Sequence, residues 1–244
     1  MARTPEELMD GLLRTADAAL GDAFSAVLYG SMVRGDFVPG RSDLNLLLIA
    51  RPLTVERLRA LGPALAAFER EGQTPPLLFD ETEWHRAADV FPIEITDMRL
   101  AYRVLRGADP LAEHLVAPGD LRRALEHEWR GKVLRLRQDF AAHLDLPDSL
   151  GQAIARSAGS VRVLLRTTLV LAGRTPPADD TALVEEAAIL SGAPASPPRP
   201  RVLAAALAHR RDPSWSCSPA AFEGYLTAIE QLTRFVDHFH AGET

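Results

Sequence analysis

Residues 27–49 read Val-Leu-Tyr-Gly-Ser-Met-Val-Arg-Gly-Asp-Phe-Val-Pro-Gly-Arg-Ser-Asp-Leu-Asn-Leu-Leu-Leu-Ile. An apolar strand runs into Gly30-Ser31, a polar loop follows, and Asp43 and Asn45 open a second apolar strand. Glycine lets backbone donors approach phosphates closely, and residues i and i+2 of a strand point to the same face. The stretch therefore predicts a phosphate-binding turn beside two oxygen ligands, at positions 43 and 45.

The composition of the chain is that of a globular protein with one large domain or two ordinary ones. It has 244 residues, 47% of them hydrophobic and 25% charged. A net charge of -6 argues against general nucleic-acid binding. The single Cys217 excludes an intramolecular disulfide and a multi-cysteine metal site. We find no basic leader and no apolar run of ~20 residues, so we expect a soluble cytoplasmic protein that does not enter a membrane.

The first half of the chain alternates between strand and helix patterns. Thr4-Pro5-Glu6-Glu7 is a capping box that predicts a helix over residues 5–20. The remaining patterns predict strands over 26–29, 44–49, 77–79 and 91–97, a helix over 54–71, and a short helix from Asp80. Within that short helix we expect Trp84 to pack in the core, and we assign no role to His85. The alternation predicts an α+β domain over residues 1–110, with helices flanking a small mixed sheet.

The pattern becomes entirely helical after Gly107. Segments with helical periodicity, separated by proline and glycine clusters, cover 120–143, 149–172, 180–191, 201–210 and 219–240. We therefore predict an all-α helical bundle over residues 119–244. The apolar stripe of 227–239 is expected inside this bundle or at a homodimer contact.

The motif of residues 27–49 resembles that of the nucleotidyltransferase superfamily, which includes polymerase β and the aminoglycoside nucleotidyltransferases. Its signature is an apolar residue, Gly-Ser, about ten residues, and then Asp-apolar-Asp/Glu-apolar. Here the two parts are Tyr29-Gly30-Ser31 and Asp43-Leu44-Asn45-Leu46, and the helical second half is similar in plan to the bundle of the small nucleotidyltransferases.

The resemblance implies an enzyme that moves a nucleoside monophosphate to a hydroxyl of a small molecule or protein. ATP or another nucleoside triphosphate would be the donor, with Mg²⁺ or Mn²⁺. Gly30, Ser31, Arg34 and Lys132 would then contact the nucleotide. Asp43, Asn45 and Glu94 would be the metal ligands, with Asp97 in reserve, and Asp43 and Glu94 would be catalytic. Asn45 stands where the family has a carboxylate, so one negative ligand is missing.

Two other functions stay open at this stage. Because Asn45 removes a charge, the chain could be a degenerate member that binds a nucleotide or a partner without turnover. Alternatively, helical domains of toxin–antitoxin ribonucleases carry an arginine and a histidine with four to six residues between them, and Arg234 to His240 has this spacing. Between these, the sequence favours the nucleotidyltransferase, because Gly30, Ser31, Asp43 and a third carboxylate are all present.

Overall fold

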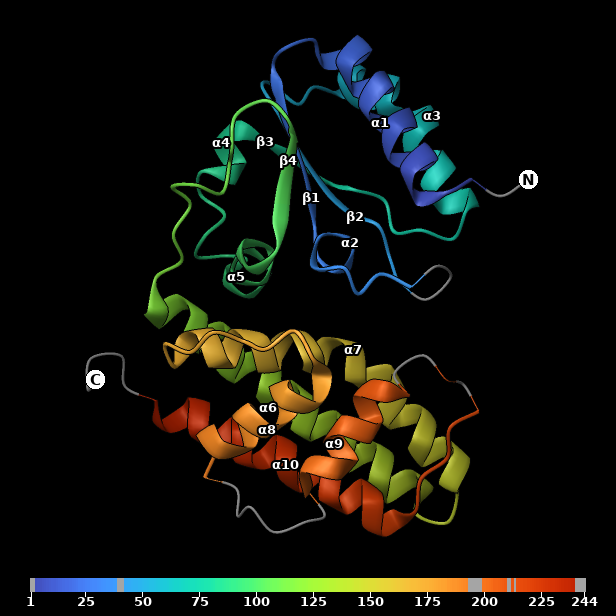
Figure 1. Cartoon of the computed structure of the whole chain (residues 1–244), viewed down its shortest axis with the longest axis vertical. Helices are drawn as coiled ribbons and strands as arrows, with labels where there is room; N and C mark the ends of the chain where they lie inside the picture. The colour runs from blue at the N-terminus through green and yellow to red at the C-terminus, as the bar shows by residue number, and fades with distance from the viewer. Residues whose placement is uncertain (1–2, 39–41, 193–198, 210–211, 213, 240–244) are drawn as a thin grey trace. The chain divides into compact units, whose positions relative to one another are not determined.

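Contacts divide the computed structural model into two units, Met1–Val116 and Ala117–Thr244, which are described separately. The structure describes residues 3–38, 42–192, 199–209, 212 and 214–239. Figure 1 labels the helices and strands of both units.

The first helix forms as its capping sequence predicts. In α1 (Pro5–Leu20), the Thr4 side chain accepts a hydrogen bond from the Glu7 amide, and the Glu7 carboxylate accepts one from the Thr4 amide at 2.9 Å. Pro5 occupies the first helical position, where its missing N–H costs nothing. The helix therefore begins at a residue that the sequence specifies locally.

A mixed four-stranded sheet is the centre of the first unit. Its strands are β1 (Phe24–Tyr29), β2 (Asn45–Ala50), β3 (Leu77–Asp80) and β4 (Tyr102–Arg106), in the order β3-β2-β1-β4. β1 is antiparallel to both β2 and β4, whereas β2 and β3 are parallel. In the β1–β2 register Tyr29 is the partner of Asn45, so the end of one strand faces the beginning of the next.

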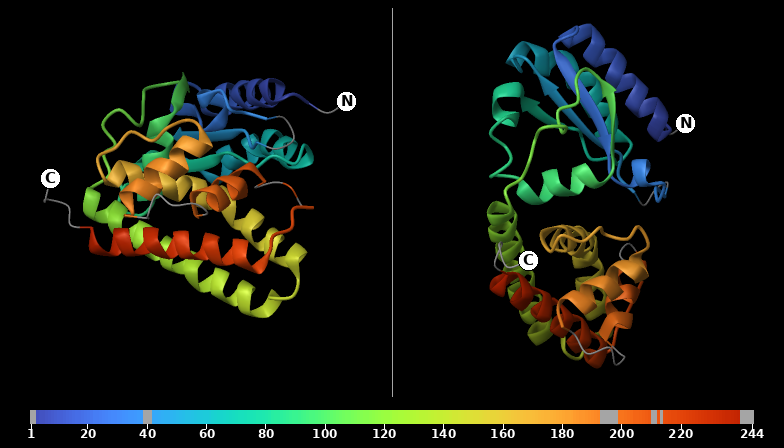
Figure 2. Two further views of the ribbon diagram at one scale, coloured as in Figure 1. Left: turned by 60° about the horizontal axis from the view of Figure 1, so that its bottom comes forward. Right: turned by 60° about the vertical axis from the view of Figure 1, so that its left-hand side comes forward.

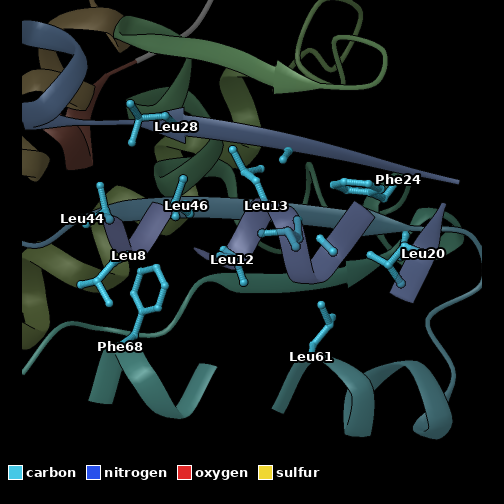
Figure 3. Close-up of a cluster of buried hydrophobic side chains, with 14 of the residues drawn as sticks. Leu8, Leu12, Leu13, Leu20, Phe24, Leu28, Leu44, Leu46, Leu61 and Phe68 are labelled. Carbon is cyan, nitrogen blue, oxygen red and sulfur yellow. The ribbon is translucent and has the colours of Figure 1, made fainter. Parts of the chain in front are cut away.

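Helices cover both faces of this sheet, which explains why β1 and β2 are almost continuously apolar. α1 and α3 (Val55–Arg70) lie on one face, while α4 (Glu81–Trp84) and α5 (Pro92–Leu100) lie on the other (Figures 1 and 2). Figure 3 shows the core on the α1 side, where Leu12 and Phe68 belong to one cluster with Leu28 and Leu46 of the strands. On the other side, Val27 and Ile49 pack with Trp84.

The strand predicted over residues 91–97 is wrong, because this segment is the helix α5. The alternating run Ile93-Glu94-Ile95-Thr96 is too short to separate a strand from a helix. Pro92, interpreted as a strand start, occupies the first position of the helix, and the Ile95 amide donates to the Phe91 carbonyl at 3.0 Å. The fourth strand is β4, which follows immediately and was missed.

The second unit is helical throughout its described residues, as predicted. Its helices are α6 (Pro118–His143), α7 (Pro147–Leu171), α8 (Asp180–Leu190), α9 (Arg199–Ala208) and α10 (Pro219–His238). α10 packs along α6 and α9, and α7 packs on α6 and α8. Trp129 and Tyr225 are fully buried at its centre, where the Trp129 indole donates to Thr168 Oγ1 at 3.1 Å.

No helix in the described part of the chain is long and apolar enough to cross a membrane.

Candidate functional site

The Gly30 turn connects the end of β1 to the short helix α2 (Ser31–Arg34). Its backbone has φ +82° and ψ -144°, a conformation that is essentially restricted to glycine. The Gly30 amide donates to the Ala101 carbonyl at 3.0 Å, which ties the turn to the residue before β4. A backbone hydrogen bond therefore holds the turn in place at the end of β1.

The backbone beyond the turn presents two amides to an incoming ligand. The Gly30 carbonyl accepts from the amides of Val33 and Arg34 at 3.1 and 3.0 Å. The Ser31 and Met32 amides come before these first bonds, so they have no acceptor within α2. Together with the half-buried Ser31 hydroxyl, they form a small group of donors beside a glycine. This chemistry is suited to phosphate oxygens.

Asn45 lies directly against the Gly30 turn. A Cβ added to Gly30 would stand 2.8 Å from Asn45 Nδ2, so the amide occupies the space that any other side chain at position 30 would need. Gln73 fixes the backbone that leads into Asn45, because its Oε1 accepts a hydrogen bond from the Leu44 amide at 2.8 Å. Asp43, half-buried, comes two residues before Asn45. Positions 30 and 45 are therefore brought together, as the sequence motif predicts.

Two carboxylates of α5 lie on the other side of β1, near the Tyr29 hydroxyl. Burial raises the pKa of Tyr29 to about 12, and the negative charges of Asp97 and Glu94 add to this rise. Glu94 is exposed in the first turn of α5, and Asp97, one turn later, is half-buried. They share a helix face because they are three residues apart. Tyr29 stays protonated at neutral pH and can donate a hydrogen bond to an acceptor in the site.

The charged loop after α2 is arranged around an internal ion pair. Arg34 Nε lies 3.4 Å from Asp36 Oδ1, and the Arg34 side chain is only 14% exposed. Part of the arginine's charge is therefore already balanced before any nucleotide binds. Asp36 is engaged in this pair, which separates its role from that of the metal ligands expected at positions 43 and 45.

The remaining residues of interest belong to the second unit. Lys132 is half-buried on α6. Arg234 is exposed on α10, and it lines a small pocket of about 270 Å³ with residues of α6 and α10. His240, the other half of the predicted ribonuclease motif, lies outside the described residues.

The donor set does not amount to a metal centre made by the protein alone. Within residues 3–38, 42–192, 199–209, 212 and 214–239, no three His, Cys, Asp or Glu side chains converge to hold a metal ion. Asn45 contributes an amide in place of a charge, and its Nδ2 faces Gly30. Mg²⁺ can still be held by one or two carboxylates together with substrate phosphates. A divalent cation therefore fits here as part of a metal–nucleotide substrate.

The architecture of the chain is the nucleotidyltransferase fold. The chain is similar to spectinomycin adenyltransferase AAD(9) from Enterococcus faecialis, a structure with ATP and spectinomycin. The similarity covers 95% of this chain and 99% of that one, with a TM-score of 0.54 and 13% sequence identity. No protein-family model and no curated protein sequence matches the chain. At this identity the similarity shows the fold, and it confirms the predicted resemblance to the nucleotidyltransferases.

Sequence reasoning missed two components of the site. Tyr29 was assigned only as the apolar residue before Gly-Ser, although its hydroxyl lies near both α5 carboxylates. Ala101 was not assigned at all, because a backbone carbonyl that anchors a turn leaves no signal in its side chain. The proximity of residues 29 and 97 follows from the packing of α5 on the sheet, which no local pattern specifies.

Proposed function

We propose that the chain binds a nucleoside triphosphate, ATP or a related donor, at the turn formed by Gly30 and Ser31. The donor enters as its Mg²⁺ or Mn²⁺ complex, and its monophosphate is transferred to a hydroxyl of a small molecule. The observation that supports the proposal is the contact of Asn45 with Gly30, because the start of β2 then lies against the turn that follows β1. The nucleotidyltransferase fold of the whole chain supports it.

The residues of the turn have distinct roles in this reaction. The amides of Ser31 and Met32 and the Ser31 hydroxyl would donate to the phosphate oxygens beyond the α-phosphorus. Asp43 supplies negative charge beside them, and a bound divalent cation would neutralise phosphate charge. These groups orient the donor so that its α-phosphorus faces the acceptor hydroxyl.

The α5 carboxylates would accept the proton that the acceptor hydroxyl loses. When the acceptor oxygen bonds to the α-phosphorus, the bond from that phosphorus to the pyrophosphate oxygen breaks, and the acceptor hydroxyl loses its proton. Glu94 is the exposed carboxylate that can accept this proton, and Asp97 is its reserve. Tyr29 cannot act as the base because its pKa of about 12 keeps it protonated.

A second candidate function is nucleotide binding without turnover. It is favoured by Asn45, since an amide lacks the charge that a carboxylate would add beside the transferring phosphate. The amide group facing Gly30 is also a donor, which suits a phosphate oxygen better than a cation. In this case the site would sense or hold a nucleotide for a partner.

The acceptor proposed for the transfer is a small molecule with a hydroxyl group. The similar AAD(9) structure contains ATP and spectinomycin, which supports a small-molecule acceptor. Lys132, the only lysine of the chain, remains a proposed contact to the anionic nucleotide.

Calorimetric titration with ATP, GTP, CTP and UTP, with and without Mg²⁺, tests the binding step. We expect binding of at least one nucleotide, and its loss in Asp43→Ala. If none of the four binds, both nucleotide proposals fail.

The variant Asn45→Asp separates the two candidates. With a panel of hydroxyl-bearing acceptors, an increase of pyrophosphate release by tenfold or more would identify the natural chain as a weakened transferase. Equal release by the natural chain and Asn45→Asp would show that the missing charge is unimportant. Release by neither, with nucleotide binding intact, would favour the binding function.

A further inference from the structure

A groove of about 760 Å³ lies in the first unit, at the end of the sheet opposite the Gly30 turn. It is bordered by the beginning of β1, the end of β2, α4 and the loop of residues 107–114. At ~3.3 Å per residue, the length of β1 separates the groove from the turn by roughly 16 Å. A ligand bound here would therefore be distinct from the nucleotide proposed above.

The loop that forms one wall is fixed to β1. Ser25 Oγ donates to the Ala108 carbonyl at 2.8 Å. Gly107 has φ +71°, and a Cβ at this position would collide with the Phe24 carbonyl. The wall is consequently held close to the strand by contacts that only glycine permits, so the groove is a defined feature of the unit.

The lining carries an excess of negative charge. Four carboxylates, Asp22, Glu81, Asp109 and Glu113, line the groove with one arginine, Arg51. Arg51 pairs with Glu81 at 2.7 Å, and Asp109 accepts from the Tyr102 hydroxyl at 2.9 Å. Asp22 and Glu113 make no ion pair within the described part of the chain. The groove is thus suited to a cationic ligand.

His114 provides a buried acceptor at the same place. Its ring stacks on Trp84, with centroids 4.7 Å apart and planes at 20°, and the residue is 9% exposed. Trp84 is itself held by a hydrogen bond from its indole to the Pro110 carbonyl at 3.0 Å. His114 Nε2 has no hydrogen-bond partner among the described residues. Burial, His85 and Arg99 lower the pKa of His114, so its ring is neutral and one nitrogen can accept.

We propose that this groove binds an organic polyamine, with ammonium groups at the Asp22 and Glu113 carboxylates and a donor directed to His114 Nε2. A metal ion fits less well, because no three ligating side chains in the described ranges converge on one point. Carboxylates spaced along the groove match the ammonium groups spaced along a polyamine. The volume is also within the roughly 300–1,000 Å³ of small-molecule sites.

Titration of the full chain with spermidine, at ionic strength matched with NaCl, tests the site. We expect saturable binding, and no binding of glycerol as an uncharged probe. Asp22→Asn combined with Glu113→Gln should weaken binding by roughly fivefold or more, since each exposed pair contributes modestly. The matched control, Asp10→Asn combined with Glu69→Gln, removes two exposed carboxylates outside the groove and should leave the affinity unchanged.

His114→Phe tests the buried acceptor, because phenylalanine retains the stacking on Trp84 and removes both ring nitrogens. We expect a loss of affinity of at least threefold with the thermal midpoint of unfolding retained. An absence of spermidine binding, or an equal loss in the control variant, would overturn the proposal. Unchanged affinity in His114→Phe would also contradict it, whatever the outcome of the nucleotide titrations.

Discussion

Gly30→Ala is the substitution for which the structure gives the sharpest expectation. Two costs add at this position. A non-glycine residue at φ +82° and ψ -144° is strained, at about 1–3 kcal/mol. The new Cβ would also lie 2.8 Å from Asn45 Nδ2, so the amide must leave its place, at a further ~1 kcal/mol. We expect a total loss of about 2–4 kcal/mol in the free energy of unfolding.

Gly72→Ala is a matched control for the backbone term. Gly72 also has a positive φ, of 67°, but a Cβ there meets nothing within 4 Å. This variant should cost only the strain, about 1–2 kcal/mol. In a protein of this size, 1 kcal/mol changes the unfolding midpoint by about 2–4 °C, so thermal unfolding followed by circular dichroism resolves the difference.

A double-mutant cycle isolates the contact itself. Asn45→Ala combined with Gly30→Ala should recover about 1 kcal/mol relative to the sum of the single variants, because the clash is gone while the strain remains. Equal destabilisation by Gly30→Ala and Gly72→Ala, together with additive values in the cycle, would refute the contact of Asn45 with Gly30. The proposed site would then lose its main structural support.

Three further predictions concern Tyr29, a buried leucine of the first unit and an exposed leucine of the second. The pKa of Tyr29 is raised from 10 to about 12 because the folded state disfavours the ionised side chain. The stability that comes from keeping Tyr29 protonated is fully present below pH 10, and about 2 kcal/mol of it is lost as the pH rises to 12. Urea unfolding at pH 9 and pH 11.5 should therefore show a smaller decrease for Tyr29→Phe than for the natural chain; parallel decreases would refute it. Leu12→Ala should cost about 2–5 kcal/mol because Leu12 is 1% exposed in the core. Leu134→Ala, at a position 61% exposed, should change the unfolding free energy by less than about 0.5 kcal/mol, and a large effect there would contradict the burial pattern.

Local sequence predicted most elements because their signals are short in range. The capping box at Thr4 predicts the beginning of α1, and the apolar runs that end at Tyr29 and begin at Leu44 predict β1 and β2. The Pro-initiated α10 was predicted from Ser218 in the same way. Each of these signals acts within a few residues, so no tertiary contact is needed to interpret it.

α5 shows where such reasoning fails. A proline is acceptable both at the start of a helix and at the edge of a strand. Two isoleucines around Glu94 alternate over too few residues to distinguish the two periods. The helix is selected by packing, since Ile95 and Met98 are buried together with Trp84 against the sheet.

The stretch from Gly30 to Asn45 predicted the fold through its resemblance to the nucleotidyltransferase motif, which is contained in neighbouring residues of the sequence. The same residues could not show that Asn45 turns its amide onto Gly30, or that Tyr29 lies near carboxylates more than sixty positions away. Nor could they place His114 on Trp84 in an acidic groove at the opposite end of the sheet. These arrangements depend on strand register and on helix packing, which are decided by burial of the whole core and not by neighbours in the sequence.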